Sequence, residues 1–418
     1  MINHSIRAGK VSVVIPCLNE APSIQECVAR AWQALDGNGL EGEVIVADNG
    51  SDDGSAELAV AAGARVVHEP RRGYGSAYLA GFAAARCEYI VMLDADLTYD
   101  FADIPRFVEE LDAGAEFVIG NRMDNIHAGA MPWLHRYFGN PVMTMALNVL
   151  FRAGVDDVWC GMRGFRRDVL PRLDLRATGM EFALEMVIRA SKVRLRTNQI
   201  PIELHPRLGV SKLSSFRDGW RGLRFMLVHS PTYLFAVPAL VMMALGVVAM
   251  TAVLAQVDLF GREWEIHTLI GGSALLVAGS QLLAMSICAR VYGVYLMGER
   301  DPWIARLRER LRLEHGLGLG GLLVFAGVVV GGTVVVRWID RGLGELSEAR
   351  LAVLATTLVL IGLQTFFLSF LISILGLRRR DYPVQPRLAA ADGREVPELA
   401  PVPTPAYQTE SLRTEAEA

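Results

Sequence analysis

The stretch Tyr89–Asp100, YIVMLDADLTYD, decides the fold of the N-terminal half. It begins with an apolar, β-prone run that breaks off at Asp94-Ala95-Asp96. This pattern is typical of a buried parallel strand whose carboxyl end opens into a crevice. Two carboxylates at positions i and i+2 of such an end can reach one hard divalent cation, directly or through water. We therefore predict that Asp94 and Asp96 bind Mg²⁺ or Mn²⁺, whereas an isolated DxD would favour a solvated turn.

Strands and helices alternate around this stretch. Apolar, β-branched runs predict strands at Val11–Ile15, Glu43–Ala47, Arg65–His68, Tyr89–Leu93 and Glu116–Gly120. Helical patterns lie between them, at Ala21–Leu35, Ala56–Ala62 and Ser76–Arg86. This order predicts a Rossmann-like α/β domain with a mostly parallel sheet, which binds ligands at the carboxyl ends of its strands.

Polar clusters follow three of the predicted strands and mark this edge as the candidate site. Their members are Pro16, Cys17, Leu18, Asn19 and Glu20; Asp48, Asn49, Gly50 and Ser51; and Asp94, Ala95 and Asp96. Gly73 and Gly75 belong to GYGSAY, which lacks the third glycine of the GxGxxG fingerprint and follows the third strand. Small residues before a helix let backbone amides approach a phosphate. A tight turn without a ligand is the alternative that this segment leaves open.

The second half of the chain is apolar. Of all 418 residues 52% are hydrophobic, and the mean hydropathy is +0.31. Four long apolar stretches run over Thr232–Gln256, Thr268–Ala289, Leu317–Trp338 and Leu351–Gly376. Each is near the ~20 residues that a helix needs to cross a bilayer. Because they contain almost no charge, we predict an all-α membrane domain of four transmembrane helices rather than four buried helices of a soluble domain.

Basic residues orient these spans. Arginines gather between spans two and three, from Arg290 to Arg312, and after span four at Arg378–Arg380. The positive-inside rule then places the N-terminal domain and both termini in the cytoplasm, at a bacterial-type inner or plasma membrane. The polar first residues, without a signal-peptide pattern, agree with this orientation. The five cysteines lack metal-binding spacing and are interpreted as reduced thiols.

The sequence thus divides into four parts. We predict an α/β domain over residues 1–210, an interfacial amphipathic helix over 211–230, the membrane domain over 231–377 and a disordered cytoplasmic tail over 378–418. The pattern of Leu213–Val228 mixes aromatic and basic residues, and Pro132–Arg152 is also helical and rich in aromatics. Both could be core helices, but we interpret them as a platform at the membrane interface.

Seven motifs in order carry a family resemblance. They are IPCLNE (15–20), DNGSDDGS (48–55), GYGSAYLAG (73–81), DADLTYD (94–100), IGNR (119–122), DVWCGMRGFRR (157–167) and GVSKLSSF (209–216). Together they resemble the family 2 glycosyltransferases with the GT-A fold, and most closely the polyprenyl- and dolichyl-phosphate sugar synthases. The resemblance implies a membrane-bound hexosyltransferase that moves one hexosyl unit from a nucleotide sugar to a polyprenyl phosphate, with inversion.

The resemblance also implies roles for individual residues. Pro16, Leu18, Asn19, Glu20 and Asp48 match positions lining the base and ribose pocket, and Asp94 and Asp96 match the metal and diphosphate pair. Arg122 and Arg136 match basic residues near the phosphates, while Arg207 and Lys212 match residues closing the site. We add Ser51, Gly73, Gly75 and Ala95 to the predicted donor-binding set. Where several members have a glutamine as a further metal ligand this chain has Thr98, which leaves the full ligand set open.

We expect Asp96, Arg122 and Asp157 to carry catalysis. A lipid phosphate is already anionic, so it needs positive charge and orientation more than a strong base. Asp157 could be a general base, could orient a basic residue or could help to hold the metal. Glu185 could serve the site, but a structural salt bridge is the favoured interpretation. His127, His135 and His205 lack HxH or HExxH spacing and are interpreted as non-ligands.

Two other functions compete with this one. A processive polysaccharide synthase would carry a QxxRW motif, which the sequence lacks. A non-catalytic partner in lipid-linked sugar translocation would not need Asp48, Asp94, Asp96 and Arg122 intact. UDP-glucose is favoured over GDP-mannose as donor, and we expect no nucleic-acid partner. Small residues in the spans suit close packing within or between subunits, so a homo-oligomer stays open.

Overall fold

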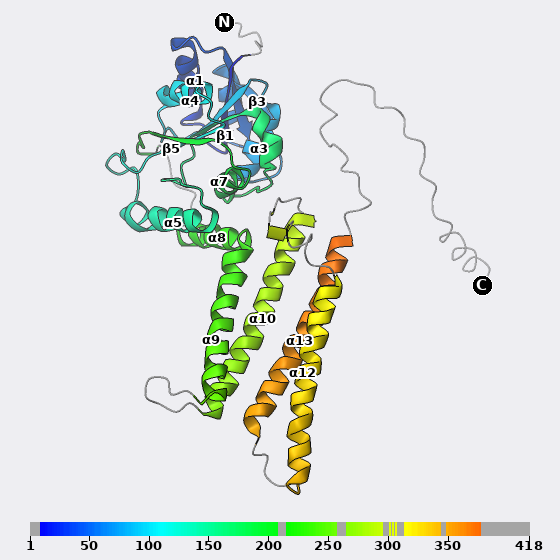
Figure 1. The fold of residues 1–418 in the computed structure, drawn as a ribbon. Helices are drawn as coiled ribbons and strands as arrows, with labels where there is room; N and C mark the ends of the chain where they lie inside the picture. The colour runs from blue at the N-terminus through cyan, green and yellow to red at the C-terminus, as the bar shows by residue number, and fades with distance from the viewer. Residues whose placement is uncertain are drawn as a thin grey trace, which may run out of the picture.

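A computed structural model describes residues 9–207, 215–256, 265–295, 301, 303–304, 306, 313–343 and 348–377. An α/β domain lies at one end of a bundle of long helices, as Figure 1 shows. This arrangement confirms the predicted fold class. The predicted tail over 378–418 and Lys212 lie outside the described residues.

A seven-stranded sheet in the order β3-β2-β1-β4-β6-β5-β7 forms the centre of the α/β domain. The strands are β1 (Val11–Cys17), β2 (Gly42–Asp48), β3 (Arg65–His68), β4 (Tyr89–Met92), β5 (Phe117–Asn121), β6 (Arg163–Arg166) and β7 (Thr197–Pro201). β6 runs antiparallel to both of its neighbours, and every other pair is parallel. The mostly parallel sheet was predicted, but β6 and β7 were not.

Strand register brings the polar clusters together. Cys17 lies opposite Asp48, and Asp48 lies opposite His68, so β1, β2 and β3 end at one edge. Beyond β4 the backbone amide of Leu93 still donates to the carbonyl of Val14, at 3.3 Å. The acids that follow Leu93 therefore emerge beside the ends of β1 and β2.

Helices cover both faces of the sheet, because its strands are apolar on both sides. The covering helices are α1 (Ile24–Gly37), α2 (Ser55–Ala61), α3 (Tyr74–Ala84), α4 (Ile104–Asp112) and α7 (Phe182–Lys192). α1 packs against α2 and α4, whereas α3 packs against β1, β2 and α7. Gly81 permits the close approach of α3, because a Cβ there would lie 2.4 Å from a methyl group of Val14.

Two helices form the side of the domain that faces the bundle (Figure 1). The predicted helix Pro132–Arg152 is a π-helical turn, η2 (His135–Gly139), followed by α5 (Asn140–Phe151). α8 (Ser215–Val228) packs against α5. We call their exposed large apolar side chains the apolar platform; they are Trp133, Leu134, Tyr137, Phe138, Val142, Met145, Val149, Trp220 and Val228.

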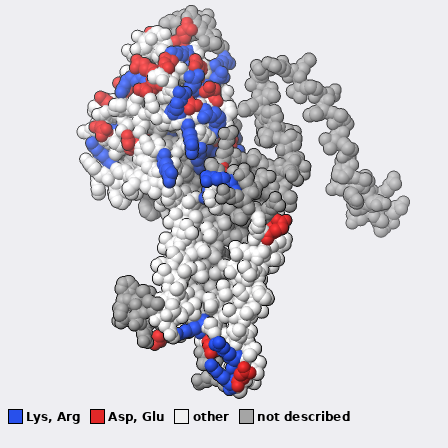
Figure 2. Space-filling view, viewed as in Figure 1, with Lys and Arg blue, Asp and Glu red and all other residues white. Residues whose placement is uncertain are grey.

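Four helices are long and apolar enough to cross a membrane: Thr232–Leu254, Ile266–Val294, Leu313–Asp340 and Ala349–Leu375. They comprise η4 (Thr232–Ala236) with α9 (Val237–Leu254), α10 (Ile266–Tyr295), α12 (Leu313–Asp340) and α13 (Ala349–Leu377). α9 packs on α10, α12 on α13, and α10 on α13. Figure 2 shows few charged residues along these helices and many on the α/β domain.

Glycines set the closest helix contacts in this bundle. A Cβ on Gly246 of α9 would lie 2.7 Å from the carbonyl oxygen of Gly272 in α10. A Cβ on Gly320 of α12 would lie 2.7 Å from the backbone nitrogen of Phe366 in α13. Backbones this close leave no space for a methyl group, which is how small residues stabilise helix pairs in lipid.

Gly320→Ala should therefore destabilise the protein by about 1–3 kcal/mol, because α12 and α13 must move apart. Gly318→Ala is the matched control, since a Cβ there meets nothing within 4 Å. Thermal unfolding in detergent, followed by tryptophan fluorescence, should show a lower Tm for the Gly320 variant alone. Equal Tm values for the two variants would contradict this account of the helix pair.

Candidate active site

Asp94 lies just beyond β4, with its carboxylate bound by two tyrosines of α3. Oδ1 of Asp94 accepts hydrogen bonds from the hydroxyls of Tyr74, at 2.9 Å, and Tyr78, at 3.2 Å. The next carbonyl, that of Ala95, accepts from the hydroxyl of Ser23 at 2.6 Å. Helices α1 and α3 thus fix the turn between the two acids from opposite faces of the sheet.

Asp96 binds groups from two distant segments. Its Oδ1 accepts from the amide of Thr98 at 3.1 Å and from the Thr98 hydroxyl at 2.6 Å. Its Oδ2 accepts from Nε of Arg207 at 2.8 Å and lies 2.6 Å from Nη2. Thr98 therefore orients Asp96, and Arg207 brings the segment before α8 to the acid pair.

The carboxyl group of Asp94 is buried beside the negative charge of Asp96. Burial raises the pKa of Asp94 to about 6, with a further contribution from the negative charge of Asp96, although the tyrosine hydrogen bonds oppose it. A positive charge in contact with both carboxylates would relieve this repulsion. Arg207 supplies a positive charge to Asp96 alone, and oxygen ligands so placed suit a hard divalent cation.

Asp48 is the last residue of β2 and lies at the same edge of the sheet. Its side chain accepts hydrogen bonds from the amides of Ser51, at 3.1 Å, and Gly50, at 3.3 Å, and binds Nδ1 of His68 at 3.1 Å. Burial alone would raise the pKa of Asp48, but these hydrogen bonds outweigh it and lower the pKa. Asp48 is consequently a fixed, ionised hydrogen-bond acceptor at neutral pH.

The loops after β1 and β2 are joined through Asn19 and Ser51. The amide of Asn19 donates to the Ser51 hydroxyl at 3.0 Å, and Oδ1 of Asn19 accepts from the amide of Asp52 at 3.0 Å. The amide of Glu20 donates to the hydroxyl of Ser55 at 2.9 Å. The structure thus brings the predicted polar clusters together, with the Pro16–Glu20 segment beside Asp48.

Gly73 and Gly75 contact protein backbone. A Cβ would lie 2.1 Å from the carbonyl oxygen of Thr178 at Gly73, and 2.2 Å from that of Ala177 at Gly75. The amide of Gly73 donates to Oδ1 of Asn49 at 2.7 Å, and that of Ser76 donates to Thr178 at 3.2 Å. These contacts favour the tight-turn alternative over a phosphate cradle.

Arg122 and Asp157 form a buried, two-pronged ion pair. Nε of Arg122 donates to Oδ2 of Asp157 at 2.6 Å, and Nη2 donates to Oδ1 at 2.8 Å. Asn140 also donates to Oδ1, at 2.8 Å. Burial alone would raise the pKa of Asp157, but the charge and hydrogen bonds of Arg122 lower it. Among the three roles left open for Asp157, these contacts favour orienting a basic residue.

Tyr99 links this ion pair to the acid pair. Its hydroxyl accepts from Nη1 of Arg122 at 3.3 Å and from the amide of Gly161 at 2.7 Å. Gly161 also lies against Asp94, because a Cβ there would be 2.5 Å from Oδ2 of Asp94. Arg122 is therefore part of the same site, held from β5 on one side and from the 157–161 loop on the other.

Arg163 is a buried residue of the site that sequence reasoning missed. Its side chain is fully buried and donates to the carbonyls of Cys160, at 2.9 Å, Val158, at 2.9 Å, and Ala183, at 2.6 Å. It thereby fixes the loop that carries Asp157 and Gly161. The motif DVWCGMRGFRR contains it but gives it no role, because an arginine is normally expected at the surface.

Two predicted residues do not join the acid pair. Arg136 is half-buried in η2, with its guanidinium 5.5 Å from the centre of the Tyr137 ring, and no contact described here links it to Asp94 or Asp96. Glu185 is buried and accepts from the amides of Arg176, at 2.9 Å, and Ala177, at 2.8 Å. These contacts favour the structural role over a role in the site for Glu185.

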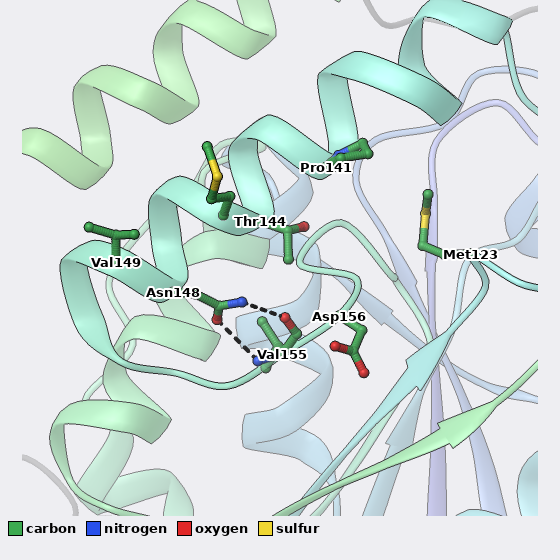
Figure 3. Close-up of a pocket in the computed structure, with 8 residues that line it drawn as sticks. Met123, Pro141, Thr144, Asn148, Val149, Val155 and Asp156 are labelled. Atoms are coloured by element: carbon green, nitrogen blue, oxygen red, sulfur yellow. Dashed lines mark hydrogen bonds between the residues drawn. The ribbon is translucent and has the colours of Figure 1, made fainter.

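A mostly apolar groove of about 590 Å³ runs beside α5 (Figure 3). One of its lining residues is Met123, which follows Arg122 in the chain. Asn148 closes one side by exchanging hydrogen bonds of 2.7 and 3.1 Å with the backbone of Val155, and Asp156 lies at its other wall. The remaining lining residues are Pro141, Thr144, Met145 and Val149. The groove is thus lined by Met145 and Val149 of the apolar platform as well as by Met123.

Two family models match the chain. Glycosyl transferase family 2 matches residues 12–173, and the glycosyltransferase family 2 C-terminal transmembrane region matches residues 287–376. The low-salt glycan biosynthesis hexosyltransferase of Haloferax volcanii is 41% identical over 371 residues, covering 88% of this chain and 90% of that protein. The dolichyl-phosphate hexose transferase of the same organism is 32% identical over 210 residues, covering 50% of this chain and 89% of that protein.

Among solved structures, glucosyl-3-phosphoglycerate synthase from Mycobacterium tuberculosis, in complex with phosphoglyceric acid, is 24% identical. The match covers 53% of this chain and 80% of that chain, with a TM-score of 0.44.

The raised pKa of Asp94 predicts a stability effect. The folded state favours the neutral acid, so the raised pKa contributes to the free energy of unfolding. This contribution is complete below the usual pKa of 3.8 and is lost as pH rises through about 6. Asp94→Asn cannot ionise and should be more stable than wild type at pH 7.5 in EDTA, with a Tm higher by a few degrees. The difference should shrink as pH falls from 7 to 5. Asp156→Asn, at an exposed acid, is the control, and a pH-independent difference would refute the explanation.

Proposed function

The chain belongs to glycosyl transferase family 2 and is a membrane glycosyltransferase; from this premise we propose that it transfers one hexosyl unit from a nucleotide sugar to a polyprenyl phosphate, with inversion. One observation carries the proposal. Asp96 of the acid pair is bound by Arg207, from the segment that leads to α8 and the spans. A site so closely tied to the membrane-facing segment suits an acceptor that resides in the bilayer.

The donor is proposed to lie along the ends of β1, β2 and β4. Asp48, with its lowered pKa, would accept hydrogen bonds from the base or ribose, beside the Pro16–Glu20 segment. Asp94 and Asp96 would hold Mg²⁺ or Mn²⁺, which supplies positive charge to the diphosphate when bound. The carboxylate pair fits such an ion, because hydrogen bonds hold its oxygens in place and the buried Asp94 needs a positive counter-charge.

Arg122 is proposed to stabilise the charge that develops on the leaving diphosphate. Asp157 holds two of its nitrogens, so the guanidinium is fixed in place before the donor arrives. A fixed charge requires no reorganisation as the glycosidic bond breaks, which is the basis of electrostatic preorganisation. Because the acceptor phosphate is already anionic, Asp157 is not required as a base.

The acceptor is proposed to reach the site over the apolar platform. Trp133, Tyr137 and Trp220 expose 72%, 70% and 58% of their surface there, which suits the interface between headgroups and acyl chains. The groove beside α5 would receive the first apolar units of the lipid. The names of the two Haloferax volcanii relatives support a hexose as the transferred sugar, and that of the second supports dolichyl phosphate as the acceptor class.

The spans are proposed to anchor the enzyme, with the α/β domain and both termini in the cytoplasm. Polar side chains of α10 and α13 satisfy each other: Ser273 bonds Thr357 at 2.6 Å, and Ser280 donates to Gln364 at 2.7 Å. Paired groups of this kind do not form a path for a hydrophilic headgroup. This favours the single-transfer enzyme over a translocation partner, and the missing QxxRW motif disfavours a processive synthase.

Purified protein with Mg²⁺, a panel of nucleotide sugars and a short polyprenyl phosphate should yield a polyprenyl-phosphate hexose, identified by mass. UDP-glucose is the expected donor. Excess EDTA or Asp96→Asn should remove most activity, because the diphosphate then lacks its counter-charge; Asp36→Asn, at an exposed acid of α1, should not. Full turnover in EDTA, or a product extended by several sugars, would overturn the proposal.

A double-mutant cycle tests the role given to Asp157. Arg122→Gln and Asp157→Asn should each lower kcat by about 10²-fold or more, with a smaller effect on nucleotide affinity measured by calorimetry. If Asp157 acts through Arg122, the double variant should be no slower than Arg122→Gln alone. Fully multiplicative losses would instead assign Asp157 a separate role, such as general base.

A further inference from the structure

Three side chains with metal-binding atoms meet on the surface near the acid pair. The imidazole nitrogens of His127 and His205 and a carboxylate oxygen of Glu203 all lie within 4.8 Å of one another. Nε2 of His127 is 2.8 Å from Oε2 of Glu203, and Nε2 of His205 is 3.5 Å from the same oxygen. The two rings stack with their centres 4.4 Å apart. Both histidines therefore direct the same nitrogen to one point.

The backbone beneath these side chains is fixed by hydrogen bonds. Ile126 and Leu204 form a parallel bridge, in which the amide of His127 donates to the Leu204 carbonyl at 3.0 Å. The amide of His205 donates to the carbonyl of Thr98 at 2.9 Å. The loop after β5 and the segment after β7 are thus held in register, and only the side chains need to adjust to a ligand.

We propose that His127, Glu203 and His205 bind a borderline transition-metal ion such as Zn²⁺. Two imidazoles and one carboxylate are typical ligands of zinc and its neighbours, whereas Mg²⁺ prefers oxygen alone. Bonds of about 2.0–2.1 Å to a tetrahedral ion place ligand atoms ~3.4 Å apart. Small rotations bring the three atoms to that spacing, since each side chain is at least one-third exposed.

Other acids lie near Glu203. Burial raises the pKa of Asp103, and the negative charges of Asp100 and Glu203 raise it further, although Arg106 opposes them. Glu203 therefore shares its surroundings with other acids. A simple surface pair between His127 and Glu203 would explain one contact, but not the stacked second histidine directed at the same oxygen.

A metal here would join two segments that serve the acid pair. Glu203 and His205 precede Arg207, which binds Asp96, and His127 belongs to the loop that follows Arg122. The ion would hold the Arg207 segment against the end of β5. This site does not depend on the proposed sugar transfer. It also replaces our interpretation of both histidines as non-ligands, which rested on spacing: 76 residues separate His127 from Glu203.

Cobalt spectroscopy tests the site without relying on activity. The full chain without a histidine tag, in detergent with millimolar Mg²⁺ to occupy hard-oxygen sites, is titrated with Co²⁺. We expect d–d absorption typical of tetrahedral or five-coordinate cobalt, which saturates at one ion per chain and is displaced by Zn²⁺. His127→Gln and His205→Gln should each weaken Co²⁺ binding at least tenfold.

Two controls make the result decisive. His135→Gln, which alters a histidine of η2 outside the cluster, and Asp96→Asn should both retain the cobalt spectrum. Thermal unfolding without metal should be the same in the His127 and His205 variants as in wild type; if either is unstable, Glu203→Gln replaces it. The proposal fails if the spectrum is absent, persists in the His127/His205 double variant, or is lost in Asp96→Asn.

Discussion

The burial of the Asp94 carboxyl group beside a second acid, Asp96, is the constraint on which the site depends. β4 delivers both acids to one short turn, and burial raises the pKa of the first to about 6. Such a turn persists only if positive charge and hydrogen-bond donors come from elsewhere in the chain. Tyr74 and Tyr78 supply donors from α3, and Arg207 supplies a charge from beyond β7. Elements far apart in the sequence thus converge on one turn.

Arg122 supplies a further positive charge to the site, but its own burial must be compensated. A buried guanidinium must be paired, and Asp157 pairs it through two hydrogen bonds. Asp157 is in turn held by Asn140, from the first turn of α5, and its loop is fixed by Arg163. The helix that carries part of the apolar platform is therefore connected to Arg122 through Asp157, which binds both Asn140 and the guanidinium. Membrane contact and site geometry are linked through Asn140.

The sequence predicted those features that depend on continuous local patterns. β1, β2, β4, β5 and the four spans are mostly apolar runs, β3 has two adjacent valines, and the acid pair directly follows β4. β6 was missed because RGFR contains one apolar side chain, and β7 because TNQIP is mostly polar. Arg163, the tyrosines around Asp94 and the cluster of His127, Glu203 and His205 depend on tertiary contacts. No local pattern distinguishes such residues from ordinary surface or core positions.

The two glycines of GYGSAY show how the structure can favour one of two physical meanings that a motif leaves open. Their spacing left a phosphate cradle and a tight turn without a ligand open, and in the structure they let the 177–178 backbone approach α3. Glu185 holds that same backbone by accepting the amides of Arg176 and Ala177. α7 and α3 are thereby joined directly behind the tyrosines that bind Asp94. The glycines thus act on the acid pair indirectly, since a side chain at either position would displace the helix that holds Asp94 in place.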